Sequence, residues 1–289
     1  MGGEMMDFRY YFLKEGTRIY EKSDLITYFK SNPYIEEQTK GDNRIYLYHH
    51  PVLNFEARFI MTSKSCVPHL ERLNPKFFDV NFLVEFNILT QTYAVELILD
   101  IIEDIVKLFK FYVYNEAFEN VSPFRRSMMI KAFEAWKKAY KDNHEDEIAN
   151  YNRLDPQTIS QVYGYLQRKS KLEILIDKNK VTISNYFFLH AEKSRTAFVA
   201  IAWDGYMPFI LPPAVDILYL DDGKYTKYIP MREVMSKAEK LFKPIDGYGV
   251  IQMVDSKNTK KLHKILTKDK FAPLTTELKL LSIDKILDI

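Results

Sequence analysis

Residues 79–114 read DVNFLVEFNILTQTYAVELILDIIEDIVKLFKFYVY, and the spacing of apolar residues changes part-way along this stretch. Up to Gln91, apolar and polar residues alternate, which is typical of a strand with one buried face. After Thr92 the apolar residues recur every three or four positions and charged residues take the other side, which is typical of an amphipathic helix. The predicted buried positions are Phe82, Val84, Phe86 and Ile88 in the strand, and Val95, Ile98, Leu99, Ile102, Ile105, Val106 and Phe109 in the helix. The stretch therefore predicts a strand that leads into a long helix, both buried against the rest of the chain.

The segments on either side of this stretch predict a sheet that the strand can join. A first strand is expected over residues 9–13, and a hairpin over 44–49 and 53–62. Ser122-Pro123 predicts the start of another helix, because a capping residue followed by proline suits the first helical turn. Strands that follow one another closely, with long helices around them, indicate an α+β unit whose sheet is mainly antiparallel.

A polar run, KDNHEDEIANYN at residues 141–152, is the best candidate for a boundary between domains. We therefore expect an α+β domain over residues 1–145 and a second α+β domain over 153–289. In the second, Asp155-Pro156 predicts a helix start, residues 172–176 and 181–189 predict a hairpin, and 196–203 predict a further strand. From residue 215 on, strands alternate with helices, the last one capped by Ser256, which predicts a small α/β-like layer at the C-terminus.

The composition of the chain excludes some classes of function but does not identify a particular function. The net charge of +2 gives no field that would draw the whole molecule to nucleic acid or acidic lipid. The single cysteine, Cys66, cannot form an internal disulfide, which favours a reducing cytoplasm. Neither a signal peptide nor a transmembrane segment is predicted, so a soluble cytoplasmic protein is expected. Twenty Phe and twenty Tyr predict an aromatic core, and they also suit adhesive protein surfaces.

The sharpest local motif is Tyr219-Leu220-Asp221-Asp222, which resembles the YxDD box of reverse transcriptases. A polymerase also needs an earlier aspartate that binds metal, and Asp204 lies too close in sequence to leave room for the intervening palm helices. An Asp-Asp-Gly turn after a strand is the simpler interpretation. The same region leaves open a metal-dependent phosphoryl-transfer enzyme in which Asp216, Asp221 and Asp222 converge.

A zinc site is the other metal hypothesis, because Cys66 and His69 have plausible ligand spacing. His49 and His50 would complete it, but an extended strand over 53–62 carries Cys66 far from them. A buried thiol and exposed histidines are the expected alternative, so no metal and no cofactor is predicted.

The last predicted helix carries five lysines at steps of three and four, and they therefore share one face: Lys257, Lys260, Lys261, Lys264 and Lys268. Leu262, Ile265 and Leu266 lie on another face. Such a lysine face suits phosphates or an acidic protein surface, and a merely solvated face is the alternative. The helix itself has no arginine or aromatic residue among the lysines to read bases.

These observations favour a non-enzymatic interaction protein that binds and modulates another macromolecule, for example an immunity or defence-inhibitor protein of a bacterium or phage. Another protein is the expected partner, and weak nucleic-acid binding through the five lysines is a further expectation. Two alternatives remain open: the metal-dependent enzyme, and an accessory factor that binds nucleic acid.

Overall fold

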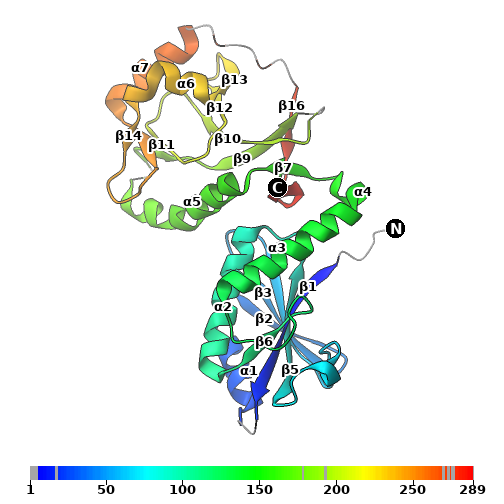
Figure 1. Ribbon diagram of the computed structural model, residues 1–289. Coiled ribbons are helices and arrows are strands. Elements are labelled where there is room, and N and C mark those ends of the chain that lie inside the picture. The colour runs from blue at the N-terminus through cyan, green and yellow to red at the C-terminus, as the bar shows by residue number, and fades with distance from the viewer. Residues whose placement is uncertain are drawn as a thin grey trace. The chain divides into compact units, whose positions relative to one another are not determined.

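The computed structural model describes residues 6–16, 19–177, 179–191, 194–268, 271, 274 and 277–288. The chain divides into two compact units, Met1–Glu145 and Asp146–Ile289. The fold is α+β, as the hydrophobic patterns predicted: 36% of the residues are helical and 32% lie in strands (Figure 1). No helix among the described residues is long and apolar enough to cross a bilayer.

The first unit is built on a six-stranded sheet in the order β2-β3-β4-β5-β1-β6, and all neighbouring strands in it are antiparallel. The strand predicted from the sequence is β5, which pairs with β4 on one side and β1 on the other. The strands are β1 (Asp7–Glu15), β2 (Ile35–Lys40), β3 (Asn43–His49), β4 (Glu56–Met61), β5 (Phe77–Asn87) and β6 (Tyr112–Tyr114).

The long predicted helix is α2, and the side that the spacing assigned to the core is buried from Val95 to Ile105. On its outer side, Glu103 lies 3.0 Å from the Arg126 guanidinium at the start of α3, which ties the two helices together. The helices of this unit are α1 (Lys22–Lys30), the one-turn η1 (Leu70–Arg72), α2 (Thr92–Phe109) and α3 (Arg126–Asn143).

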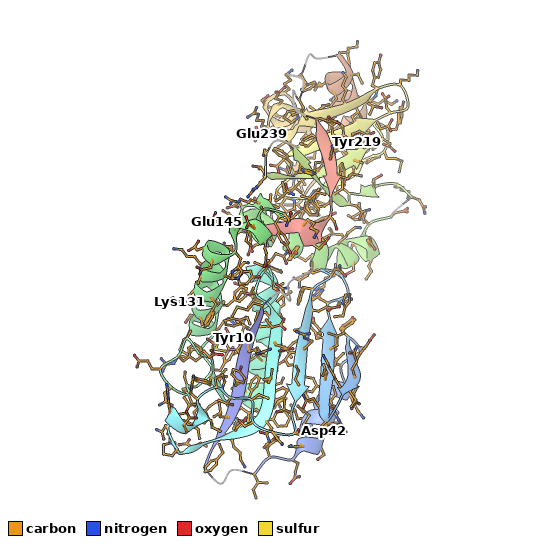
Figure 2. All side chains as sticks on the ribbon, turned by 90° about the vertical axis from the view of Figure 1, so that its right-hand side faces the viewer. Tyr10, Asp42, Lys131, Glu145, Tyr219 and Glu239 are labelled. Carbon is orange, nitrogen blue, oxygen red and sulfur yellow. The ribbon has the colours of Figure 1, made fainter. Side chains whose placement is uncertain are left out.

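An aromatic core fills the space between the sheet and its helices. Phe8 on β1 meets Phe133 on α3 edge to face, with ring centroids 5.4 Å apart. Tyr10, which is labelled in Figure 2, is fully buried, and its hydroxyl donates a hydrogen bond to the Met129 carbonyl. Aromatic residues thus supply most of the large buried side chains, as the composition predicted.

The opposite face of β5 is buried as well, so the strand is not the half-buried element that alternation predicted. Leu83 belongs to a second apolar cluster with Tyr11 and Leu13. Glu85 is also buried, because the guanidinium groups of Arg9 and Arg58 each lie 2.9 Å from its carboxylate. Charged neighbours on both adjacent strands therefore make a polar residue acceptable in the middle of the sheet.

The second unit contains a five-stranded sheet, β13-β12-β10-β9-β16, in which only β10 and β12 are parallel. A four-stranded sheet, β14-β15-β11-β8, and a parallel pair, β17-β7, complete it. The strands are β7 (Asn152–Leu154), β8 (Thr182–Ile183), β9 (Tyr186–Ala191), β10 (Ala197–Trp203), β11 (Phe209–Leu211), β12 (Ile217–Asp221), β13 (Thr226–Pro230), β14 (Lys243–Pro244), β15 (Gln252–Val254), β16 (Leu278–Leu281) and β17 (Ile286–Asp288).

Two helices of this unit, α6 and α7, pack on strands β10 and β12 through one apolar cluster. Leu218 and Leu220 of β12 meet Val234 of α6 and Leu262 and Leu266 of α7, all fully buried. This is the α/β-like layer expected near the C-terminus. The remaining bounds are α4 (Glu145–Ile148), α5 (Pro156–Leu175), α6 (Met231–Ala238), η2 (Glu239–Leu241), α7 (Ser256–Lys268) and η3 (Ile283–Lys285).

Two local predictions were wrong. Residues 172–176, expected as the first arm of a hairpin, form the end of α5, where Ile174 stays 84% exposed. Ser122, expected to cap a helix, pairs with Val113 in a β-bridge instead, and α3 begins at Arg126. In these two places a strand pairing or the continuation of a helix outweighed the local sequence preference.

Candidate functional site

The helix α7 is held at its start by Asp255 rather than by the predicted Ser256. The Asp255 carboxylate accepts a hydrogen bond from the Asn258 amide at 2.9 Å, and its carbonyl accepts one from the Thr259 hydroxyl. Lys243 lies 2.6 Å from the same carboxylate, and this contact lowers the pKa of Asp255. With Leu262 buried on the inner side, the orientation of the helix is fixed from its first turn.

All five predicted lysines, Lys257, Lys260, Lys261, Lys264 and Lys268, are exposed on α7. We call these five residues the lysine face. None of them forms an ion pair with a carboxylate in the part of the chain that the structure describes. Over the described residues, the lysine face therefore presents its positive charge to solvent without an ion-paired carboxylate.

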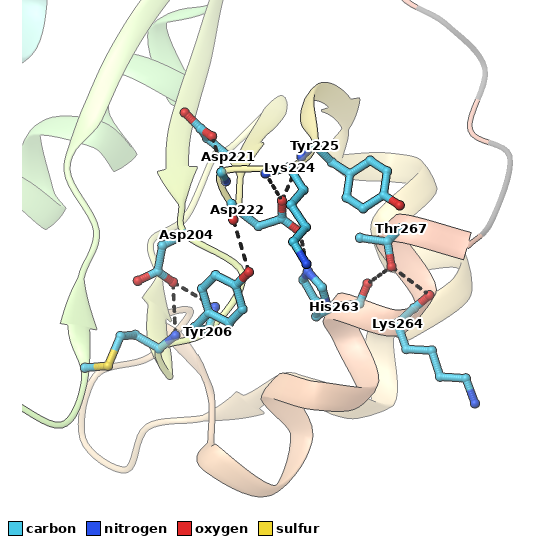
Figure 3. A network of polar contacts seen from close by, with 11 residues as sticks. Asp204, Tyr206, Asp221, Asp222, Lys224, Tyr225, His263, Lys264 and Thr267 are labelled. Atoms are coloured by element: carbon cyan, nitrogen blue, oxygen red, sulfur yellow. Dashed lines mark hydrogen bonds and ion pairs between the residues drawn. The ribbon is translucent and has the colours of Figure 1, made fainter.

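A buried carboxylate and a histidine join α7 to the turn after β12. The Asp222 side chain is 1% exposed, and one of its oxygens lies 2.6 Å from Nε2 of His263 on α7 (Figure 3). Its other oxygen accepts hydrogen bonds from the amides of Lys224 and Tyr225, at 2.9 and 2.7 Å. The hydrogen bond from His263, helped by the two amides, lowers the pKa of Asp222 to about 2. Asp222 is thus ionised at neutral pH and holds both the turn and the imidazole.

The loop after β10 lies against the other side of the histidine. Gly205 has φ of +82°, and a Cβ atom at this position would lie 2.7 Å from Cδ2 of His263. Only glycine allows so close an approach in this conformation. The next residue, Tyr206, stacks on the imidazole with ring centroids 5.6 Å apart and donates its hydroxyl to the Asp222 carbonyl at 3.0 Å.

An aspartate–histidine pair can orient an imidazole as a general base when a hydroxyl or thiol lies at the second ring nitrogen. Among the described residues, no hydroxyl or thiol group makes a hydrogen bond to Nδ1 of His263. Thr267, one turn further along α7, donates instead to the His263 backbone carbonyl at 2.8 Å. The described residues therefore form an aromatic and imidazole surface on α7 and the loop after β10, and no nucleophile among them contacts Nδ1 of His263.

The three aspartates proposed as metal ligands do not converge. Asp216 precedes β12 and accepts a hydrogen bond from the Val199 amide at 2.9 Å, while Asp221 ends the same strand about 16 Å away. Asp222 is turned toward His263. Over the described residues, no group of three or more His, Cys, Asp or Glu side chains is arranged to hold a metal ion. Burial raises the pKa of Asp216, which separates it further from Asp222 in chemical character.

The suggested zinc ligands also have other environments. Cys66 is exposed, whereas a buried thiol was expected. His50 is buried, contrary to expectation, and its Nδ1 accepts hydrogen bonds from the amides of Val52 and Leu53 at 3.2 and 3.1 Å. Burial lowers the pKa of His50, which suits this acceptor role. This histidine supports a turn.

No family model, no curated protein and no solved structure matches the chain. The candidate site therefore rests on geometry. Sequence analysis found the lysines of α7, but it did not find Tyr206 or His263. A histidine between Lys260 and Lys264 was visible in the sequence, yet nothing local indicated that Asp222, 41 residues earlier, would pair with it.

Proposed function

We propose that the protein is a non-enzymatic interaction protein that binds and modulates another macromolecule through the lysine face of α7. The observation that supports this most directly is the exposure of all five lysines, none of which forms an ion pair with a carboxylate among the described residues. Like charges held this close on one helix repel one another, and an anionic partner relieves that repulsion. A protein of this kind acts by occupying its target, as immunity proteins and defence inhibitors do.

The attraction is local, because the net charge of the chain is only +2. Acidic residues elsewhere nearly balance the lysines, and at physiological salt the screening length is about 8 Å. The partner must therefore bring its negative charges into direct contact with α7. A nucleic acid and an acidic protein surface both meet this requirement. We propose a reducing cytoplasm as its compartment, and the single cysteine supports this.

Heparin-agarose, a polyanion without bases, tests the proposal. The α7 triple variant, Lys260→Glu, Lys261→Glu and Lys264→Glu, should elute at much lower salt than the wild type, because it reverses the lysine face and leaves the apolar side of the helix unchanged. The control reverses three exposed lysines of the first unit, Lys22, Lys131 and Lys138, and should elute nearly as the wild type does.

The control carries the same change in net charge as the α7 triple variant. Equal losses of retention in the two variants would show that retention follows total charge, and the proposal would then be wrong. Circular dichroism of both variants establishes that the fold is retained.

A further inference from the structure

We infer that the macromolecule bound by the lysine face is a single-stranded nucleic acid, whose bases stack on Tyr206 and Tyr225 while its phosphates contact the lysines. This inference rests on the proposed function and names the partner class for the same site. It departs from the partner protein expected from the sequence, because the loop after β10 and the turn after β12 supply aromatic rings that α7 itself lacks.

The Tyr206 ring is exposed and held in place, so that a base can stack on it. It is 60% exposed although it is a large aromatic residue, and its ring is held by His263 on one face and by a hydrogen bond from its hydroxyl to Asp222. The Asp204 carboxylate fixes the loop by accepting hydrogen bonds from the amides of Tyr206 and Met207 at 2.9 and 3.0 Å. A ring already held in place loses little conformational entropy when a base stacks on it.

Tyr225 provides a second exposed ring on the turn between β12 and β13. It is 48% exposed, and the turn that carries it is fixed by Asp222. The Lys227 ammonium lies 5.7 Å from the centre of its ring. In the view of Figure 3, the Tyr206 and Tyr225 rings lie on either side of the Asp222–His263 pair.

Several lysines are close in sequence to these rings or to His263. Lys260 lies one helical turn before His263, Lys264 follows it directly, and Lys224 is on the same turn as Tyr225. Two exposed acids described in this region, Asp204 and Asp221, each have a carboxylate oxygen engaged by loop amides. The charge of Asp222 faces His263. Among the described residues named here, lysines outnumber exposed acids, and this charge suits a phosphate backbone.

Exposed rings beside lysines are the arrangement by which proteins hold unpaired bases. A duplex hides the faces of its bases inside the stack, so the rings give no advantage for double-stranded nucleic acid. An acidic peptide would contact the lysines and would not need the tyrosine rings. Removal of the rings therefore distinguishes a single strand from both other partners.

The test is fluorescence anisotropy with a labelled 15-nucleotide oligo-dT, the duplex of the same length, and a labelled poly-glutamate peptide, at 50 and 150 mM salt. The full chain should bind the single strand at least ten-fold more tightly than the duplex or the peptide. Tyr206→Ala and Tyr225→Ala should each weaken single-strand binding by roughly 5- to 100-fold. Tyr206→Phe keeps the ring and should stay within about three-fold of the wild type.

Tyr34→Ala is the matched control, because Tyr34 is an exposed tyrosine of the first unit and should not change the affinity. Unchanged oligo-dT binding in both alanine variants, equal binding of duplex and single strand, or no binding of oligo-dT would overturn the inference. Peptide binding that ignores the rings would indicate an acidic protein partner. Heparin retention of the two alanine variants should equal that of the wild type, so loss of the inference and loss of the proposed function give different results.

Discussion

Two buried tyrosines of the first unit should respond oppositely when their hydroxyl groups are removed. Tyr10 and Tyr46 are both fully buried in the same aromatic core. The Tyr10 hydroxyl donates a hydrogen bond to the Met129 carbonyl of α3. The Tyr46 hydroxyl is buried and makes no hydrogen bond of standard geometry among the described groups, although the Arg44 guanidinium lies near enough to interact with it.

The size of the difference follows from these contacts. Tyr10→Phe keeps the ring and removes one buried hydrogen bond, which should lower the free energy of unfolding by about 1 to 2 kcal/mol. Tyr46→Phe removes a polar atom that is buried without a partner, so the free energy of unfolding should be unchanged or should rise by up to about 1 kcal/mol. The ring of Tyr46 stacks on Phe29, with centroids 4.6 Å apart, and this contact remains.

Tryptophan fluorescence during urea unfolding measures the effect in the first unit alone. The chain has two tryptophans, Trp136 in the first unit and Trp203 in the second, so a Trp203→Phe background leaves a reporter only in the first unit. Both tyrosine variants are compared with this background. Equal losses of stability, or a larger loss for Tyr46→Phe than for Tyr10→Phe, would refute the assignment of the two hydroxyl groups.

Three further predictions concern other parts of the chain. Gly205→Ala should lower the stability of the second unit by about 1 to 3 kcal/mol, measured by urea unfolding, because the positive φ and the His263 ring both oppose a Cβ atom. The folded-state pKa of Asp222, about 2, is below its unfolded value of about 3.9, so its contribution to stability should be full above about pH 4 and lost as the pH falls from about 4 to 2. The difference in melting temperature between the wild type and Asp222→Asn should therefore close over that range. A constant difference would contradict the pKa assignment. Ile102→Asp should largely unfold the first unit, since Ile102 is fully buried, whereas Asp100→Lys on the outer side of α2 should cost about 1 kcal/mol or less in a thermal melt; similar small effects would mean that the wrong face was assigned to the core.

The elements with a strong period were predictable, because one buried face determines the pattern over many residues. The strand and helix of residues 79–114 appear as β5 and α2 with the expected buried side. Residues 172–176 misled because a short apolar run suits a strand and a buried helix equally well, and α5 continues through it. Burial of Glu85 could not be foreseen, since it depends on arginines from two other strands.

The candidate site was predictable only in its charge. The lysine face follows from spacing along one helix, which sequence shows directly. The rings beside it come from two loops that precede α7 by tens of residues, and their positions depend on how β10, β12 and α7 pack together. The motif Tyr219-Leu220-Asp221-Asp222 suggested a metal site, but in the structure Asp222 pairs with His263, which no motif indicated.

The pairing of β17 with β7 has a consequence for how the protein is made. β7 begins at Asn152, and its partner β17 ends at Asp288, so the second unit joins its first strand to its last. The first unit needs nothing beyond residue 145 to complete its sheet and helices. During synthesis, the first unit can therefore fold while the ribosome is still translating the second. The pair of β7 and β17 can form only after residues 286–288 have left the exit tunnel, and until then β7 has only its bridge from Arg153 to Thr196.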